Sequence, residues 1–143
     1  MVEAKIDWVD GERFVGSASS GHALVIDSDR VRNTANGPME LVLLGLCGCT
    51  ATDVVSILRK KREPFNTLEV HAQAERAPKP PSVYTSINLV FTVSGAVSLK
   101  AVEDAVRLSE EKYCSVSAML KSTARITTEV RVVAADHKHE AAK

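Results

Sequence analysis

Three cysteines carry the chemistry that this sequence could perform. Cys47 and Cys49 lie in one apolar segment, and Cys114 follows Cys49 by 65 residues. A thiolate can act as a nucleophile or bind a metal, whereas a buried neutral thiol packs as a small hydrophobic group. The three residues therefore pose a choice between redox chemistry, metal binding and core packing.

The residues around Cys114 and Cys49 predict different stabilities for the two thiolates. Cys114 precedes Ser115, which is expected to cap a short helix, and the positive end of a helix stabilises a thiolate. We therefore expect the pKa of Cys114 to be lowered. Cys49 lies too deep in its own helix for this effect and would need a nearby cation. Arg30 and Arg32, in the loop before that helix, are the nearest candidates in sequence.

Other site chemistries find less support. A zinc site would have to combine Cys47, Cys49, Cys114 and a histidine, but cysteine pairs in zinc sites usually have two to four residues between them, and this pair has one. The sequence predicts no bound metal and no bound cofactor. It also contains no Gly-x-Ser-x-Gly elbow, dinucleotide fingerprint or phosphate-binding loop. A hydrolase or a nucleotide-binding enzyme is therefore not expected.

Composition and charge limit the classes of partner and the cellular compartment that are expected. The chain has 143 residues, with 18 Lys and Arg against 18 Asp and Glu, so its net charge is zero and it lacks a basic stripe. Neither a nucleic acid nor a membrane surface is an expected partner. The longest apolar run, residues 41–47, is short for a membrane span, and the N-terminus lacks the apolar core of a signal peptide. Three cysteines, an odd number, do not indicate a framework of disulfides. The chain is therefore predicted to be cytoplasmic, where thiols stay reduced.

Hydrophobic periodicity predicts the elements that must position the cysteines. Residues 4–8, 13–19 and 22–27 alternate as strands, and a polar loop follows. Pro38 begins a long helix that ends near Arg62; its first half is apolar on every side and its second half is amphipathic. Two strands, a helix capped by Ser98 with a buried stripe reaching Tyr113, a short helix and a last strand follow; their ranges are 68–74, 83–93, 98–113, 115–122 and 126–132. The order predicts one α+β domain over residues 1–143, with mainly antiparallel sheets around a long buried helix and a frayed tail over 136–143.

Three motifs resemble the OsmC/Ohr family of osmotically induced and organic-hydroperoxide-resistance proteins. They are Gly37-Pro38-Met39-Glu40-Leu41, Gly48-Cys49-Thr50-Ala51 and Lys112-Tyr113-Cys114-Ser115-Val116. The OsmC-like branch is the most similar in local sequence, at Asp53-Val54-Val55 and at Tyr84-Thr85-Ser86-Ile87-Asn88-Leu89. The resemblance implies an intertwined homodimer with two active sites at the subunit interface.

The resemblance also implies a cysteine-thiol peroxidase that reduces small organic hydroperoxides. Cys49 would attack the peroxide and become a sulfenic acid, and Cys114 would resolve it as a disulfide. A dithiol reductant, in some family members a protein-bound lipoyl group, would restore the thiols. We accordingly expect Cys49 and Cys114 within disulfide reach, with Cα atoms less than about 7 Å apart or able to move to that distance.

The chain departs from the peroxidase pattern beside Pro38. In the peroxidases a glutamate follows the proline directly, whereas here Met39 does, and Glu40 comes one residue later. One residue is about 100° of helix rotation, so Glu40 is only a supporting candidate, as are Arg30 and Arg32. The alternative is a non-catalytic OsmC-like module that binds a small apolar ligand at the dimer interface. A third hypothesis is redox sensing by a local disulfide between the paired cysteines of this helix.

Overall fold

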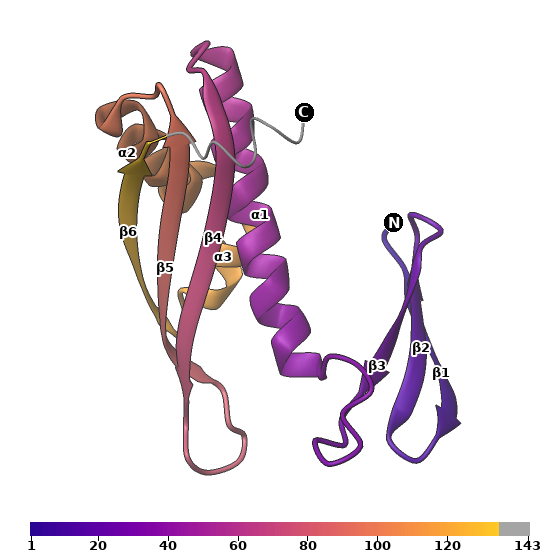
Figure 1. Cartoon of the computed structure of the whole chain (residues 1–143). Helices are drawn as coiled ribbons and strands as arrows, with labels where there is room; N and C mark the ends of the chain where they lie inside the picture. Colours follow the sequence, from indigo (N-terminus) through magenta and orange to yellow (C-terminus); the bar gives the residue numbers. More distant parts are fainter. Residues whose placement is uncertain (135–143) are drawn as a thin grey trace. The chain divides into compact units, whose positions relative to one another are not determined.

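The computed structural model describes residues 1–134, which separate into two compact units, Met1–Leu44 and Gly45 onward (Figure 1). Each unit is described by itself, and the single domain expected over residues 1–143 stays a prediction. The expected frayed tail, residues 136–143, lies outside the described residues.

The first unit contains a three-stranded antiparallel sheet in the order β1-β2-β3, as the alternating pattern predicts. The strands are β1 (Ala4–Asp10), β2 (Arg13–Ala18) and β3 (Ala23–Asp27). Gly11 makes the first turn at a φ of +49°, a conformation that favours glycine. Trp8 closes this turn by donating from its Nε1 to the carbonyl oxygen of Gly11 at 2.9 Å.

The loop after β3 is organised by a buried carboxylate. Asp27 is fully buried, and its oxygens accept hydrogen bonds from the backbone N–H groups of Asp29 and Thr34 at 2.9 and 3.1 Å. The hydroxyl of Thr34 donates to it as well. The Thr34 hydroxyl above all, together with these N–H groups, lowers the pKa of Asp27 to about 2. The loop that carries Arg30 and Arg32 therefore folds around a charged anchor.

Helix α1 (Pro38–Lys60) begins at the residue that the sequence predicts. Pro38 suits the first helical position because its missing N–H would have no partner there. The carboxylate of Glu40 accepts the N–H of Gly37 at 3.0 Å, which caps the helix start. Arg59 and Lys60 occupy the last turn, where cations complement the helix dipole.

The expectation that the first half of α1 is buried on every side is wrong for the single chain, because Val42 and Leu44 in that half are exposed. Its buried residues, Leu46, Thr50, Val54 and Leu58, recur every four residues and form one stripe. The exposed positions Gly48, Thr52 and Ser56 form a second stripe of small residues. A single chain packs against only one face of this helix. Apolar residues on its other faces are therefore not covered by the chain itself.

Among the described residues, α1 is the one helix long and apolar enough to cross a membrane, judged by length and composition. An apolar core helix of a soluble protein meets the same criteria. Here the buried stripe of α1 packs within the second unit, where Thr50 hydrogen-bonds with Ser109. The helix is thus only weak support for a membrane span.

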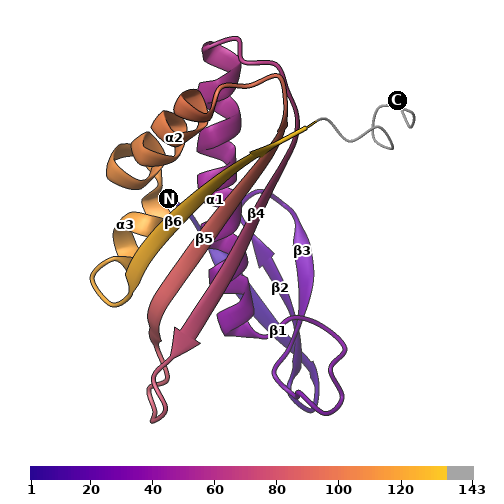
Figure 2. The same ribbon diagram turned by 60° about the vertical axis from the view of Figure 1, so that its left-hand side comes forward.

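The second unit contains a sheet in the order β4-β5-β6, built from β4 (Phe65–Arg76), β5 (Tyr84–Gly95) and β6 (Arg125–Val133). Strands β4 and β5 form an antiparallel hairpin, as expected, but β6 pairs with β5 in parallel. The connection from β5 to β6 runs through helices, which is the crossover that parallel pairing requires. Figure 2 shows these helices on one side of the sheet, together with the C-terminal part of α1.

The crossover consists of α2 (Leu99–Leu108), the π-helical turn η1 (Ser109–Tyr113) and α3 (Ser115–Leu120). Ser98 caps α2 as predicted, since its side chain accepts the N–H of Ala101 at 3.1 Å. The wider π turn changes the helical register, so Tyr113 is 51% exposed and does not continue the buried stripe. Sequence periodicity did not predict this turn, which places Ser109 and Cys114 in the site.

Candidate functional site

The second unit brings Cys49, Asp53 and Cys114 into one cluster. The two Sγ atoms and a carboxylate oxygen of Asp53 all lie within 4.8 Å of one another. Cys49 and Asp53 lie one turn apart on α1, and Cys114 comes from the start of α3. Cys49 and Asp53 are half-buried, whereas Cys114 is 3% exposed. The structure thus brings together the two thiols that the family resemblance pairs, and adds a carboxylate.

Cys114 is held by the backbone on both sides. Its N–H donates to the carbonyl oxygen of Ser109 at 2.8 Å, which closes the π turn. Its Sγ accepts the N–H of Ser117 at 3.3 Å, so Cys114 is itself the N-cap of α3, a place that the sequence assigned to Ser115. These two hydrogen bonds fix the position of the Cys114 thiol near Cys49 of α1.

The expected low pKa of Cys114 is wrong. Burial first, then a hydrogen bond with the Cys49 side chain, raise the pKa of Cys114 to about 12. The negative charge of Glu110 acts in the same direction, and the N–H of Ser117 only partly opposes it. Loss of hydration outweighs the positive end of a helix that is six residues long.

Asp53 is the site residue to which the sequence gave no role. Its Oδ2 accepts a hydrogen bond from Ser109 Oγ at 2.8 Å, and Ser109 Oγ lies 3.0 Å from Thr50 Oγ1. Ser109 and Thr50 are fully buried, so this network fixes the carboxylate. The spacing of four residues after Cys49 places Asp53 on the same helix face and was the available signal.

Cys47 does not belong to the cluster. It is half-buried, and burial raises its pKa. The metal set weighed from the sequence, three cysteines and a histidine, therefore does not form among the described residues. The grouped ligand atoms there are those of Cys49, Asp53 and Cys114.

The supporting candidates of the first unit make contacts within that unit. Arg30 Nη1 lies 3.0 Å from Glu40 Oε1, and Arg30 also donates to the carbonyl oxygens of Asp27 and Ala35. Arg32 instead pairs with Asp10 at 2.8 Å, which raises the pKa of Arg32. These bonds order the loop before α1, and any role of these side chains at the thiols stays a prediction.

A cavity of about 360 Å³ adjoins the cluster at Asp53. Its wall combines apolar side chains with two lysines: it is lined by Asp53, Ser56, Ile57, Lys60, Lys61, Leu108 and Tyr113. Because Asp53 contributes to both, the cavity reaches the edge of the thiol site. It can hold a small molecule with an apolar part.

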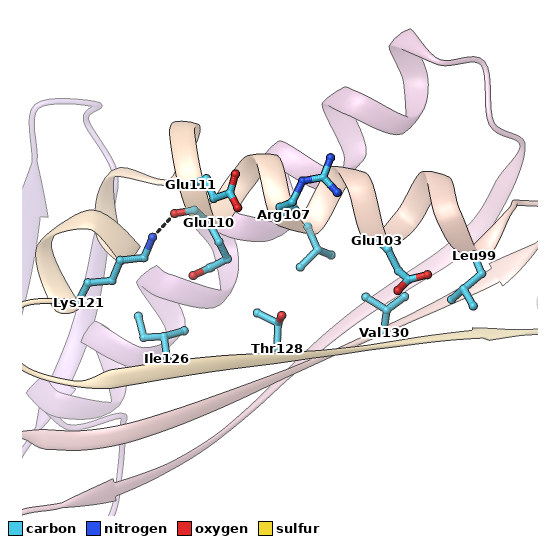
Figure 3. Close-up of a pocket in the computed structure, with 10 residues that line it drawn as sticks. Leu99, Glu103, Arg107, Glu110, Glu111, Lys121, Ile126, Thr128 and Val130 are labelled. Atoms are coloured by element: carbon cyan, nitrogen blue, oxygen red, sulfur yellow. Dashed lines mark hydrogen bonds between the residues drawn. The ribbon is translucent and has the colours of Figure 1, made fainter.

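A second hollow, of about 470 Å³, lies between the α2–η1 segment and β6 (Figure 3). Ile126, Thr128 and Val130 form its strand side, and charged side chains that include Arg107 and Glu110 form its helix side. No cysteine lines it. This hollow is mixed in polarity and separate from the thiol chemistry.

Comparison with known proteins agrees with this architecture. The OsmC-like protein family model matches residues 31–129. Protein YhfA of Escherichia coli (strain K12) is 45% identical over 136 residues, which cover 94% of this chain and 100% of YhfA. A hypothetical protein from Aquifex aeolicus VF5 has a crystal structure with a TM-score of 0.86 and 30% identity, over 95% of this chain and 98% of that one.

A more distant likeness extends to a protein named for peroxide resistance. The organic hydroperoxide resistance protein OsmC from Legionella pneumophila has a TM-score of 0.69 at 16% identity, over 92% of this chain and 97% of that one. That likeness shows the α+β fold that the sequence predicted. The family match and the relative at 45% identity lead to one assignment. The chain belongs to the OsmC-like protein family.

Proposed function

We propose that this protein is a thiol-dependent peroxidase that reduces small organic hydroperoxides. The observation that carries the proposal is the approach of Cys49 Sγ and Cys114 Sγ to within 4.8 Å. A sulfenic acid formed on one thiol then has a resolving thiol beside it, which stops oxidation at a reversible step. The name of the Legionella pneumophila structure, an organic hydroperoxide resistance protein, supports the substrate class.

The difference in exposure supports different roles for the two thiols. Cys49 is half-buried, whereas Cys114 is almost fully buried, so a peroxide reaches Cys49 first. The Cys49 thiolate attacks the terminal peroxide oxygen and the O–O bond breaks. The sulfur becomes a sulfenic acid, and the alkoxide leaves as an alcohol after taking up a proton.

Resolution then uses Cys114. Its sulfur attacks the sulfur of the sulfenic acid at Cys49, a disulfide forms, and the hydroxyl leaves as water with the proton of the Cys114 thiol. A dithiol reductant, such as a lipoyl group, reduces this disulfide and is itself oxidised to a disulfide. No bound cofactor is part of this cycle.

The cavity beside Asp53 suits the organic part of the substrate. Ile57, Leu108 and Tyr113 offer it apolar surface, and Lys60 and Lys61 lie at its wall. A small alkyl or aryl hydroperoxide could place its carbon group here and its peroxide toward the cluster. Glu40, Arg30 and Arg32 are proposed as supporting residues, on the family resemblance alone.

We further infer an intertwined homodimer that works in the cytoplasm. The small-residue stripe of α1 supports the dimer, because the chain itself leaves Gly48, Thr52 and Ser56 exposed on an apolar helix. Sedimentation equilibrium of the full chain tests this assembly. A monomer at micromolar concentration would contradict it.

Consumption of cumene hydroperoxide with a dithiol reductant tests the activity. We expect turnover by the wild type and by Cys47→Ser, the matched control, and none by Cys49→Ser. Cys114→Ser should form a sulfenic acid that a dimedone probe labels at Cys49. If the wild type consumes no more peroxide than Cys49→Ser, the peroxidase proposal fails and the alternative, a module that binds a small apolar ligand, replaces it.

A further inference from the structure

We propose that the reduced cluster of Cys49, Asp53 and Cys114 is a binding site for a thiophilic divalent cation, of which Zn²⁺ fits best. Two sulfur ligands and one carboxylate oxygen would hold the ion, and a water would complete the coordination. This binding rests on the geometry of the cluster and not on peroxidase activity.

The distances need only a small closure. Zinc binds sulfur at about 2.3 Å and carboxylate oxygen at about 2.0–2.2 Å, so tetrahedral ligand atoms lie roughly 3.5–3.8 Å apart. In the structure the three ligand atoms lie within 4.8 Å of one another before any ion is placed. Cys49 and Asp53 project from one face of α1, and Cys114 faces them from the start of α3. Side-chain adjustments of about 1 Å or less complete the site.

Two of the three ligands, Asp53 and Cys114, already have partners that would orient them. Asp53 Oδ2 accepts from Ser109 Oγ at 2.8 Å, which leaves its other oxygen for an ion. Cys114 Sγ accepts the N–H of Ser117 at 3.3 Å, a bond that a metal-bound thiolate can keep. Such outer partners fix ligand direction in metal sites, and buried Ser109 is itself fixed by Thr50.

The charges around the cluster also favour a cation. Glu110 adds a second carboxylate near Cys114, and its Oε2 accepts from Ser117 Oγ at 2.8 Å. Its Oε1 is buried without a hydrogen-bond partner within the described part of the chain. In the same residues, no lysine or arginine forms an ion pair with Asp53 or Glu110. Lys60 and Lys61 line the cavity beside Asp53, and Lys121 donates to the backbone carbonyl oxygen of Glu110, without an ion pair to either carboxylate. Both carboxylates are therefore left to interact with an ion at the cluster.

One consequence rests on the proposed peroxidase function. Metal-bound thiolates that react with one hydroperoxide and two protons yield the disulfide, an alcohol, water and the free ion. The metal and the disulfide then exclude each other, so oxidation would release the ion and the dithiol reductant would restore the site.

Titration of the reduced, metal-free full chain with Zn²⁺, against a chromogenic chelator and without oxygen, tests the binding. We expect one ion per chain and the release of protons on binding, and Co²⁺ in its place should show thiolate-to-cobalt charge-transfer absorption. Cys47→Ser is the matched control and should bind as the wild type does. Asp53→Asn and Cys114→Ser should each weaken binding by tenfold or more, and Ser109→Ala, which removes an outer partner, by about 10–100-fold.

Retained binding in the double variant Cys49→Ser/Cys114→Ser would place the ion on other groups, such as the four histidines of the chain, and would overturn the proposal. Unchanged affinity in Asp53→Asn would remove the carboxylate from the site and would overturn it too. Circular dichroism of each variant checks that the fold is kept. A wild type that binds Zn²⁺ but consumes no peroxide refutes the peroxidase alone, and the reverse result refutes the metal site alone.

Discussion

Ser109 Oγ donates a hydrogen bond of 2.8 Å to Asp53 Oδ2 and thereby ties the π turn before Cys114 to the helix that carries Cys49. The contact joins residues that lie 56 positions apart in the sequence. Together with the contact between Ser109 and Thr50, it helps to hold the two thiols in one site, because Cys114 follows directly after that turn.

Loss of this link should weaken both the fold and the site. Ser109→Ala removes the donor to Asp53 and the partner of buried Thr50, so we expect a cost of about 1–3 kcal/mol in the free energy of unfolding. Ser115→Ala, at an exposed position of α3, is the control and should change it by about 0.5 kcal/mol or less. Urea unfolding followed by circular dichroism measures both. Equal stabilities would show that the network contributes nothing.

Mild oxidation should join Cys49 to Cys114. Their sulfur atoms lie within 4.8 Å, whereas Cys47 does not belong to this group. Peptide mapping by mass spectrometry, after treatment with one equivalent of peroxide, identifies the pair. The Cys47→Ser variant should give the same disulfide. A bond between Cys47 and Cys49 would instead favour the local redox sensor and contradict the two-helix site.

Most of the contribution of α1 to the free energy of unfolding should come from its buried stripe. Leu46 is fully buried, so Leu46→Ala removes packed methyl groups and leaves a cavity, at a cost of about 2–5 kcal/mol. Thr52→Ala, on the exposed stripe of the same helix, should change stability by about 0.5 kcal/mol or less in the separated chain. Chemical unfolding at a low protein concentration compares the two. Similar losses would mean that the exposed stripe is covered.

Acid should loosen the loop before α1. Hydrogen bonds from Thr34 and the neighbouring N–H groups lower the pKa of Asp27 to about 2, against about 3.9 in an unfolded chain. A lowered folded pKa adds stability that is complete above about pH 4 and is lost as pH falls through about 2. The stability difference between wild type and Asp27→Asn should therefore be largest near neutral pH and shrink over this interval.

Hydrogen exchange of residues 28–37, with thermal unfolding at pH 7, 4 and 2, measures this effect. Asp7→Asn is the control, since Asp7 is exposed and forms only a surface ion pair with Lys5 at 3.2 Å. A difference between wild type and Asp27→Asn that stays constant from pH 7 to 2 would contradict the role assigned to Asp27.

The sequence determined by itself those features that depend on neighbouring residues. Alternating apolar positions predicted the strands, Pro38 predicted the start of α1, and Ser98 predicted the cap of α2. The motifs around Cys49 and Cys114 predicted the family. Each of these signals is local, since strand periodicity, a helix cap and a short motif are complete within a few residues.

Tertiary structure alone decided the direction of β6, the π turn at Ser109 and the place of Asp53 in the cluster. It also reversed the expected pKa shift of Cys114, because the depth at which a thiol is buried depends on elements distant in sequence. The position of a helix N-terminus, and so its effect on a nearby thiol, can be predicted from the sequence. The loss of hydration of that thiol depends on all its neighbours in space. The family resemblance implied the pairing of the two thiols, but the carboxylate and the serine that surround them are set by packing between α1 and η1.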